Sequence, residues 1–288
     1  MANLKEIRNR ITSVSSTMQI TSAMKMVSAA KLKKAQDAIT AMRPYSQKLT
    51  ELLQNLSATL DSDAGGKFTA QRTVSRVLIV AITSNRGLSG AFNSNVVKET
   101  RRLTENEYKG KHVDFITVGK KGNDVIRKAG NVILNNNSVF DELNFENAAS
   151  IADDLVQRFS EGQYDKIVLV YNQFKNAATQ IIIAEQFLPL APLASDKVST
   201  NVTDYIFEPS KEEIVLTLIP KMLRTQLYKA IRDSFAAEHG ARMTAMHKAT
   251  DNATELRNQL KLTYNKARQA AITNEILEIV GGAEALNG

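Results

Sequence analysis

Cysteine and tryptophan are absent from this chain of 288 residues, and histidine occurs only three times. Without cysteine the chain has no disulfide framework, thiolate zinc site, catalytic thiol or thiol redox switch. His239 and His247 lie eight positions apart rather than the four that bring two ligands to one metal, and His112 stands alone. No spacing indicates a nucleophilic triad or a catalytic pair of carboxylates. The sequence therefore predicts no catalytic residue, no metal and no cofactor.

Long apolar segments are missing as well. The longest uninterrupted aliphatic run covers residues 77–82, whereas a membrane-spanning helix needs about 20 apolar residues. The first ten residues carry too many charges for a secretory signal peptide. We therefore expect a soluble, intracellular protein.

Positive charge is concentrated at one end of the chain. The 37 Lys and Arg residues exceed the 30 Asp and Glu residues, which gives a net charge of +7. The first 50 residues contain nine Lys or Arg residues and two acidic residues, so this segment alone also carries +7. Such a segment favours an acidic partner.

Glycine is nearly absent from both ends. None of the 13 glycines precedes Gly65, and Gly240 is the only glycine within residues 163–280. Two helical arms therefore flank a middle that is rich in turns. The predicted division is an N-terminal coiled-coil helix over 1–64, a central α/β domain over 65–210 and a C-terminal coiled-coil helix over 211–288.

The first arm repeats apolar residues at alternating steps of three and four, the pattern of a long coiled-coil helix. Pro44 should kink this helix, because proline removes a backbone donor and clashes with the preceding turn. The seam is polar at Thr21, Lys25 and Ser28, so there either the partner helix is absent or the seam faces something polar. The seam positions are Leu4, Ile7, Ile11, Val14, Met18, Thr21, Lys25, Ser28, Leu32, Ala35, Ile39, Met42, Ser46, Leu49, Leu53, Leu56 and Leu60.

The second arm is expected to open after Pro220, since proline is favoured in the first turn of a helix. Its seam changes register once. The two arms most simply pair with each other in antiparallel fashion, and two separate bundle helices are the alternative. The seam positions are Leu223, Leu227, Ala230, Ser234, Ala237, Ala241 and Thr244, followed by Ala249, Ala253, Leu256, Leu260, Thr263, Ala267 and Ala270.

The middle alternates strand and helix patterns, which predicts a parallel sheet covered by helices, a Rossmann-like arrangement. The loop 83–90 places Gly87 and Gly90 before a helix, where backbone donors can hold a phosphate. It lacks both GxGxxG and the Lys-Ser/Thr of a P-loop, so a nucleotide-binding enzyme stays only an alternative. The predicted strands cover 74–82, 112–118, 132–134, 166–171 and 180–187, and the helices cover 93–108, 123–128 and 146–160.

Methionines and lysines lie together on the first arm. This combination is typical either of core packing or of an interface with an acidic partner. A basic scaffold that binds nucleic acid is a further alternative, but the lysine cluster lacks interleaved aromatic residues, so we expect no nucleic-acid partner. The residues concerned are Met18, Met24, Met26 and Met42 with Lys25, Lys31, Lys33 and Lys34.

Four segments, in order along the chain, carry a family resemblance. Residues 20–32 read ITSAMKMVSAAKL and residues 82–95 read ITSNRGLSGAFNSN. Residues 237–252 read AEHGARMTAMHKATDN, and residues 264–276 read YNKARQAAITNEI. Together they resemble the signatures of the γ subunit of F-type ATP synthases, in its bacterial form.

The resemblance implies a non-catalytic rotor shaft. In that family the two long helices form an antiparallel coiled coil inside a head of three α and three β subunits, while the α/β domain lies beside the ε subunit and the membrane ring of c subunits. We therefore expect these partners, a location at the cytoplasmic face of the bacterial inner membrane, and membrane association through the c ring only. Proton flow through the c ring would turn the shaft.

The resemblance also implies residue roles. The tip of the C-terminal helix, residues 272–286, would lie in an apolar sleeve of the head. Asn85 and Ser89 depart from the family, which usually has Asp and often Cys at these positions, and both lie in the α/β domain. The implied β-subunit contacts are Met24, Lys25, Lys31, Lys33, Lys34, Arg242, Arg268, Gln269 and Thr273, and the implied foot on the c ring is Tyr205, Phe207 and Glu208.

Overall fold

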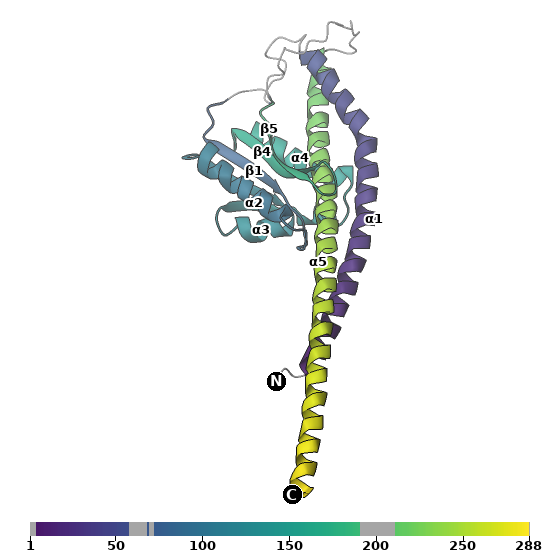
Figure 1. Ribbon diagram of the computed structural model, residues 1–288. Coiled ribbons are helices and arrows are strands. Elements are labelled where there is room, and N and C mark those ends of the chain that lie inside the picture. Colours follow the sequence, from purple (N-terminus) through teal and green to yellow (C-terminus); the bar gives the residue numbers. More distant parts are fainter. Residues whose placement is uncertain (1–3, 58–67, 69–71, 191–210, 288) are drawn as a thin grey trace. The chain divides into compact units, whose positions relative to one another are not determined.

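The computed structural model describes residues 4–57, 68, 72–190 and 211–287 (Figure 1). The chain divides into two compact units, which we describe separately. The α/β unit is Ala29–Arg242, and the coiled-coil unit combines Met1–Ser28 with Met243–Gly288. The domain boundaries predicted near residues 64 and 210 lie outside the described residues.

The α/β unit contains the alternating strands and helices that the sequence predicts. The predicted helix 93–108 is an α-helix that ends in a π-helical turn over Leu103–Glu107. A short 3₁₀ turn over Asn137–Phe140 has no counterpart in the prediction. The elements are β1 (Arg76–Ile82), α2 (Phe92–Arg102), β2 (His112–Val118), α3 (Lys120–Ile126), β3 (Asn131–Asn135), α4 (Phe145–Ser160), β4 (Lys166–Phe174) and β5 (Gln180–Leu188).

The five described strands form one sheet in the order β3-β2-β1-β4-β5. Strands β1 to β4 are parallel, as predicted, but β5 pairs with β4 in antiparallel fashion. The prediction of a wholly parallel sheet is therefore wrong at this edge. Only residues 175–179 connect β4 to β5, and a parallel pair needs a crossover of a dozen or more residues.

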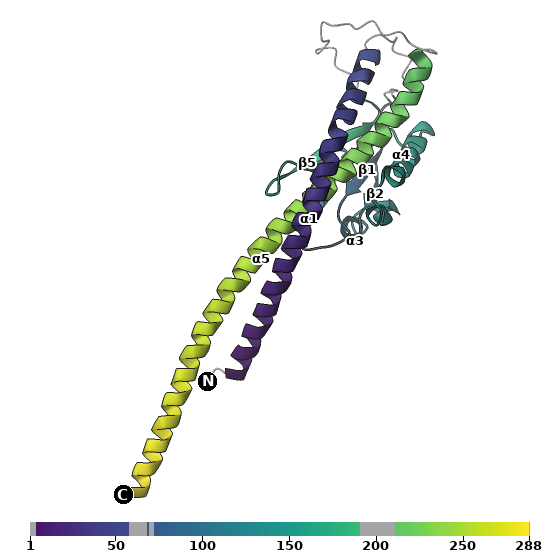
Figure 2. The same ribbon diagram turned by 90° about the vertical axis from the view of Figure 1, so that its right-hand side faces the viewer.

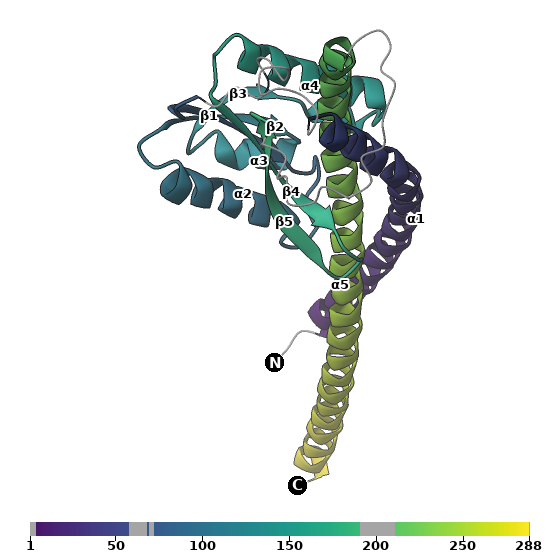
Figure 3. The same ribbon diagram turned by 90° about the horizontal axis from the view of Figure 1, so that it is seen from above.

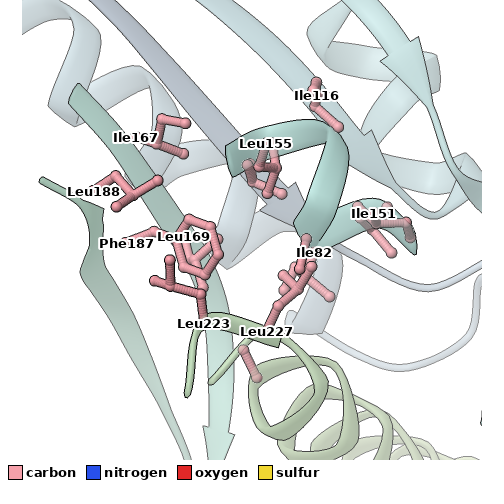
Figure 4. Packing of buried hydrophobic residues seen from close by; sticks show 14 of the residues in the cluster. Ile82, Ile116, Ile151, Leu155, Ile167, Leu169, Phe187, Leu188, Leu223 and Leu227 are labelled. Carbon is pink, nitrogen blue, oxygen red and sulfur yellow. The ribbon is translucent and has the colours of Figure 1, made fainter. Parts of the chain in front are cut away.

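Helices cover both faces of the sheet (Figure 3). On one face α2 and α3 pack through Val96 and Ile126 against Val77, Ile79 and other side chains of the strands. On the opposite face α4 and the first part of α5 (Lys211–Asn287) complete a larger core. Figure 4 shows this second core, with strand, α4 and α5 side chains converging: Ile82, Ile116, Ile151, Leu155, Ile167, Leu169, Phe187, Leu188, Leu223 and Leu227.

Helix α5 begins earlier than predicted. Pro220 lies inside the helix, not in its first turn. The proline leaves the carbonyl of the residue four positions before it without a helical donor. Ile219, Leu223 and Leu227 around it are fully or almost fully buried in the sheet core, and this packing outweighs the local cost of the proline.

Helix α1 (Leu4–Ser57) is a single helix that continues through Pro44. The kink predicted at Pro44 stays a prediction. The predicted seam is confirmed, because each of its described side chains is buried or half-buried, including Ile7, Leu32 and Ile39. Leu60 and the side chains of Ser46, Leu53 and Leu56 lie outside the described part of the chain.

The coiled-coil unit pairs the start of α1 with the end of α5. As the residue number rises along α1, that of its partner on α5 falls: Thr21 contacts Thr250, whereas Arg8 contacts Tyr264. The pair is therefore antiparallel, and separate bundle helices are excluded for this unit. Figure 2 shows the two helices side by side, with the end of α5 (yellow) continuing past the start of α1.

The second half of the α5 seam was predicted correctly at Ala249, Ala253, Leu260 and Ala267 but wrongly at Leu256, Thr263 and Ala270. Leu256 and Thr263 are exposed, and Arg257 and Tyr264 occupy the half-buried positions next to them. Arginine and tyrosine can cover a seam with their apolar stems while their polar ends reach a partner. The observed seam is Met246, Ala249, Thr250, Ala253, Arg257, Leu260, Tyr264, Ala267 and Ala271.

Two leucines on α5 test this packing. Leu227→Ala should lower the free energy of unfolding by about 2–5 kcal/mol, because it leaves a cavity in the sheet core. Leu256→Ala, the matched control at 46% exposure, should change it by no more than about 0.5 kcal/mol. Urea unfolding followed by circular dichroism measures both, and an equal cost for the two variants would contradict the assignment.

Candidate partner-contact surfaces

The polar break in the α1 seam lies against a helix. Thr21 Oγ1 is 2.8 Å from Thr250 Oγ1 across the coiled coil, and Thr250 Oγ1 also donates to the carbonyl of Met246 at 2.8 Å. Buried Ser28 donates to the carbonyl of Met24 on its own helix. Of the two explanations that the sequence left open, the seam facing polar groups is the correct one. These hydroxyls are satisfied, so the break costs little.

Lys25 and Met24 lie at the edge of this seam. Lys25 is half-buried, and its Nζ is 3.3 Å from Nδ1 of His247, which in turn lies 3.5 Å from an Asp251 carboxylate oxygen. Met24 is half-buried, whereas Met26 is 66% exposed. Met26 is therefore available to a partner, and Met24 contributes mainly to the helix pair.

Three large, exposed apolar side chains lie on α1 in the coiled-coil unit, of which the sequence had singled out only Met26. Ile20, Met26 and Val27 are large apolar side chains that are more than half exposed in the coiled-coil unit. The signal was present in the sequence, because these residues fall outside the heptad seam. Exposed apolar side chains grouped on one helix indicate a contact surface.

Three predicted contact lysines lie on α1 in the α/β unit. Lys31, Lys33 and Lys34 are exposed, while Leu32 and Ala35 between and beside them are buried. The helix therefore points its apolar residues inward and its charges outward. This arrangement leaves the three ammonium groups accessible to an acidic partner.

The loop 83–90 forms hydrogen bonds with other residues of the α/β unit. Asn93, in the first turn of α2, accepts a hydrogen bond from Ser84 N at 3.0 Å, and its amide group bonds to the hydroxyls of Ser84 and Ser89. Asn85 accepts from Lys120 N and donates to the carbonyl of Asn137. The glycines thus serve a tight turn, and the loop geometry favours a structural role over phosphate binding.

Arg242 is buried rather than free on the surface. It forms an ion pair with Glu238, one helical turn earlier on α5, and donates to the carbonyl of Gly87 in the loop. Burial raises the pKa of the Glu238 carboxyl, and the positive charges of Arg242, Lys31 and Arg86 oppose that shift. The predicted contact residue thus has its partners within the chain.

His239 is buried beside this ion pair. Its ring lies edge-on to Phe235 with 4.5 Å between centroids, and neither ring nitrogen has a hydrogen-bond partner. Burial, together with the positive charges of Lys31 and Arg242, lowers the pKa of His239 to about 4. The imidazole is therefore neutral at physiological pH.

The remaining predicted contacts lie near the end of α5 in the coiled-coil unit. Arg268, Gln269 and Thr273 are exposed, and Thr273 Oγ1 donates to the carbonyl of Gln269 at 2.9 Å. Beside and beyond them the helix exposes five large apolar side chains, which is unusual for a helix in water. They are Ile272, Ile276, Leu277, Ile279 and Val280.

The described residues contain no group of three or more His, Asp or Glu residues able to hold a metal ion. Among the helices described here, none is both long and apolar enough to cross a membrane. The predicted foot residues Tyr205, Phe207 and Glu208 lie outside the described residues.

Comparison with known proteins identifies the family. The sequence model described as ATP synthase matches residues 3–286. The ATP synthase gamma chain of Flavobacterium johnsoniae is 77% identical over the full length of both chains. The chain belongs to the ATP synthase gamma-chain family. The resemblance drawn from the four sequence motifs is thereby confirmed.

Further relatives of this gamma-chain family agree over the whole length. The ATP synthase gamma chain of Christiangramia forsetii is 68% identical and covers all of both chains. Among solved structures, the Tetrahymena thermophila mitochondrial ATP synthase central stalk and c ring contains a chain with a TM-score of 0.59 at 25% identity, covering 80% of this chain and 99% of its own. A chain of the Euglena gracilis mitochondrial ATP synthase rotor has a TM-score of 0.66 at 23% identity, covering 93% and 98%, and shares the fold.

The environment of His239 makes stability depend on pH. Because its pKa is lower in the folded chain than its ordinary 6.5, the unfolded chain binds more protons, and stability falls as pH drops from about 6.5 toward 4. When the pH falls from 7.5 to 5, the free energy of unfolding should drop in both chains, but by about 1–2 kcal/mol less in His239→Leu than in the wild type. Lys31→Gln, which removes one opposing charge from an exposed position, should also reduce the pH dependence. Parallel stability profiles for all three chains would contradict this account.

Proposed function

We propose that this chain is the central rotor shaft of a bacterial F-type ATP synthase, coupling rotation of a proton-driven c ring to ATP synthesis or hydrolysis in the head. The observation that carries the proposal is 77% identity over the full length to an ATP synthase gamma chain. The antiparallel helix pair supports it, because α5 continues past the start of α1 as a single helix with an apolar surface (Figure 2). Such an end suits a sleeve of partner subunits.

The proposed partners are three α and three β subunits, the ε subunit and the c ring. Contacts with β subunits are assigned to the exposed Lys31, Lys33 and Lys34, to the half-buried Met24 and Lys25, and to Arg268, Gln269 and Thr273. Arg242 was predicted as a member of this set, but it is not assigned as an open contact, because its guanidinium is buried within this chain. Tyr205, Phe207 and Glu208 are assigned to the foot that meets the c ring.

The role is non-catalytic in this proposal, with ATP chemistry left to the β subunits. The shaft acts because its surface is asymmetric: the side of α1 away from the seam carries the apolar Ile20, Met26 and Val27 and, further along the helix, the lysines. Each β site that meets a different side gains a different contact energy, and that difference shifts its nucleotide affinity. Exposed charge pairs are weak, so the shaft can leave one β subunit for the next.

The proposed location is the cytoplasmic face of the bacterial inner membrane. The chain would be attached there through the c ring only, by way of the foot residues. Washing membranes at low ionic strength should release the chain together with the head and ε subunit, which immunoblotting would detect. Retention of the chain by membranes that lack the c ring would contradict this attachment.

Reconstitution tests the proposed function. The purified chain is mixed with purified α and β subunits, and the mass of the complex and its ATPase activity are measured. We expect one copy of the chain per three α and three β subunits, and faster ATP turnover than in a mixture without the chain. Failure to assemble in that ratio would rule out the rotor shaft.

The exposed lysines of α1 give a sharper test of the contact assignment. The double variant Lys33→Glu/Lys34→Glu should fold normally, because both side chains are exposed, but should lower ATP turnover in the assembled complex by roughly ten-fold, as repulsion replaces attraction. Lys128→Glu, an exposed charge reversal in the α/β unit, is the matched control and should leave turnover unchanged. Equal ATP turnover in the wild type, the double variant and the control would refute the lysine contacts. It would not contradict the proposal that the chain assembles with the head.

A further inference from the structure

Arg242 is the last residue of α5 that belongs to the α/β unit, and its side chain is buried. Its Nη1 donates to the carbonyl of Gly87, and its Nη2 donates to the Glu238 carboxylate and, at 3.5 Å, lies within reach of the carbonyl of Arg86. We propose that Arg242 is a positioning residue that clamps the loop 83–90 to α5 where this helix leaves the α/β unit. Only its consequence for rotation rests on the proposed function.

The loop is held firmly enough to serve as one side of a clamp. Ser84 Oγ donates to the carbonyl of Arg86 at 2.7 Å, which fixes the turn from within. The side chain of Asn93 ties Ser84 and Ser89 to the first turn of α2. The carbonyls of Arg86 and Gly87 are therefore acceptors with a defined direction, ready for a donor from α5.

A guanidinium suits this position better than any other cation. Its planar fork offers separate Nη donors in a fixed geometry, so one edge can pair with Glu238 while the other reaches Gly87. Glu238 and Arg242 are four residues apart on α5 and therefore lie on the same side of the helix. The carboxylate orients the guanidinium toward the loop. A lysine would keep the charge but lose the two-sided contact.

The clamp opposes twisting of α5 within the α/β unit. Turning the helix about its axis would pull Nη1 away from the Gly87 carbonyl. The buried guanidinium, which is paired with Glu238, would then lack one hydrogen-bond partner, and an unpaired buried donor is costly in free energy. In a rotor shaft, torque collected by the α/β unit leaves it along two helices, α5 beyond Arg242 and α1 before Ala29. A firm grip at Arg242 reduces the angle lost to twisting of α5.

Hydrogen exchange in the isolated chain tests the clamp. In Arg242→Lys, amides of the loop 83–90 should exchange about ten-fold faster than in the wild type, because a charge-assisted bond that holds the loop is gone. Arg232→Lys is the matched control, since Arg232 lies on the same helix and bonds to the Tyr228 hydroxyl one turn away. It should leave exchange of the loop unchanged.

A role for Arg242 only as a charged contact with a partner makes the opposite prediction. In that case Arg242→Lys keeps the charge, and exchange of the loop in the isolated chain is unaltered, which would overturn the clamp whether or not the chain assembles. In membrane vesicles containing the complete synthase, the clamp predicts slower ATP-driven proton pumping for Arg242→Lys than for the wild type. Faster loop exchange with an unchanged pumping rate would overturn the role of the clamp in rotation.

Discussion

One side of α5 is buried against the β-sheet, and this packing joins the helix to the α/β unit. Ile219, Leu223, Leu227 and Ile231 share a core with the strands and α4, so the first part of this helix belongs to the α/β unit (Figure 4). The same helix then continues without a break into the coiled-coil unit. Because packed cores resist sliding, a helix anchored in this way can carry force from one unit into the other.

Polar contacts add direction to this apolar framework. A seam of small and aliphatic side chains can pack with the two helices of the coiled coil in several registers. The hydrogen bond between Thr21 and Thr250 can form in only one of these registers. In the α/β unit, the contacts of Arg242 with Glu238 and Gly87 have the same effect, since they join a loop and a helix at one place only. Each is modest in energy, but leaving its buried groups unpaired would be expensive.

The exposed lysines of the candidate contact surface follow from the sequence, whereas the burial of Arg242 does not. The exposure of Lys33 and Lys34 follows from the heptad pattern, because that pattern determines which side of α1 faces inward. The burial of Arg242 does not follow, because its partners include a backbone carbonyl 155 residues away. No pattern of neighbouring residues in the sequence predicts such a contact.

Hydrophobic periodicity and the distribution of glycine predict the helical arms, the strands of the α/β middle and the α1 seam, because both patterns act over short distances. Packing between distant segments places Pro220 within α5 and puts Arg257 rather than Leu256 in the seam. Both outcomes have one cause. Local preferences differ little between these alternatives, and the energy of burying one surface against another chooses between them.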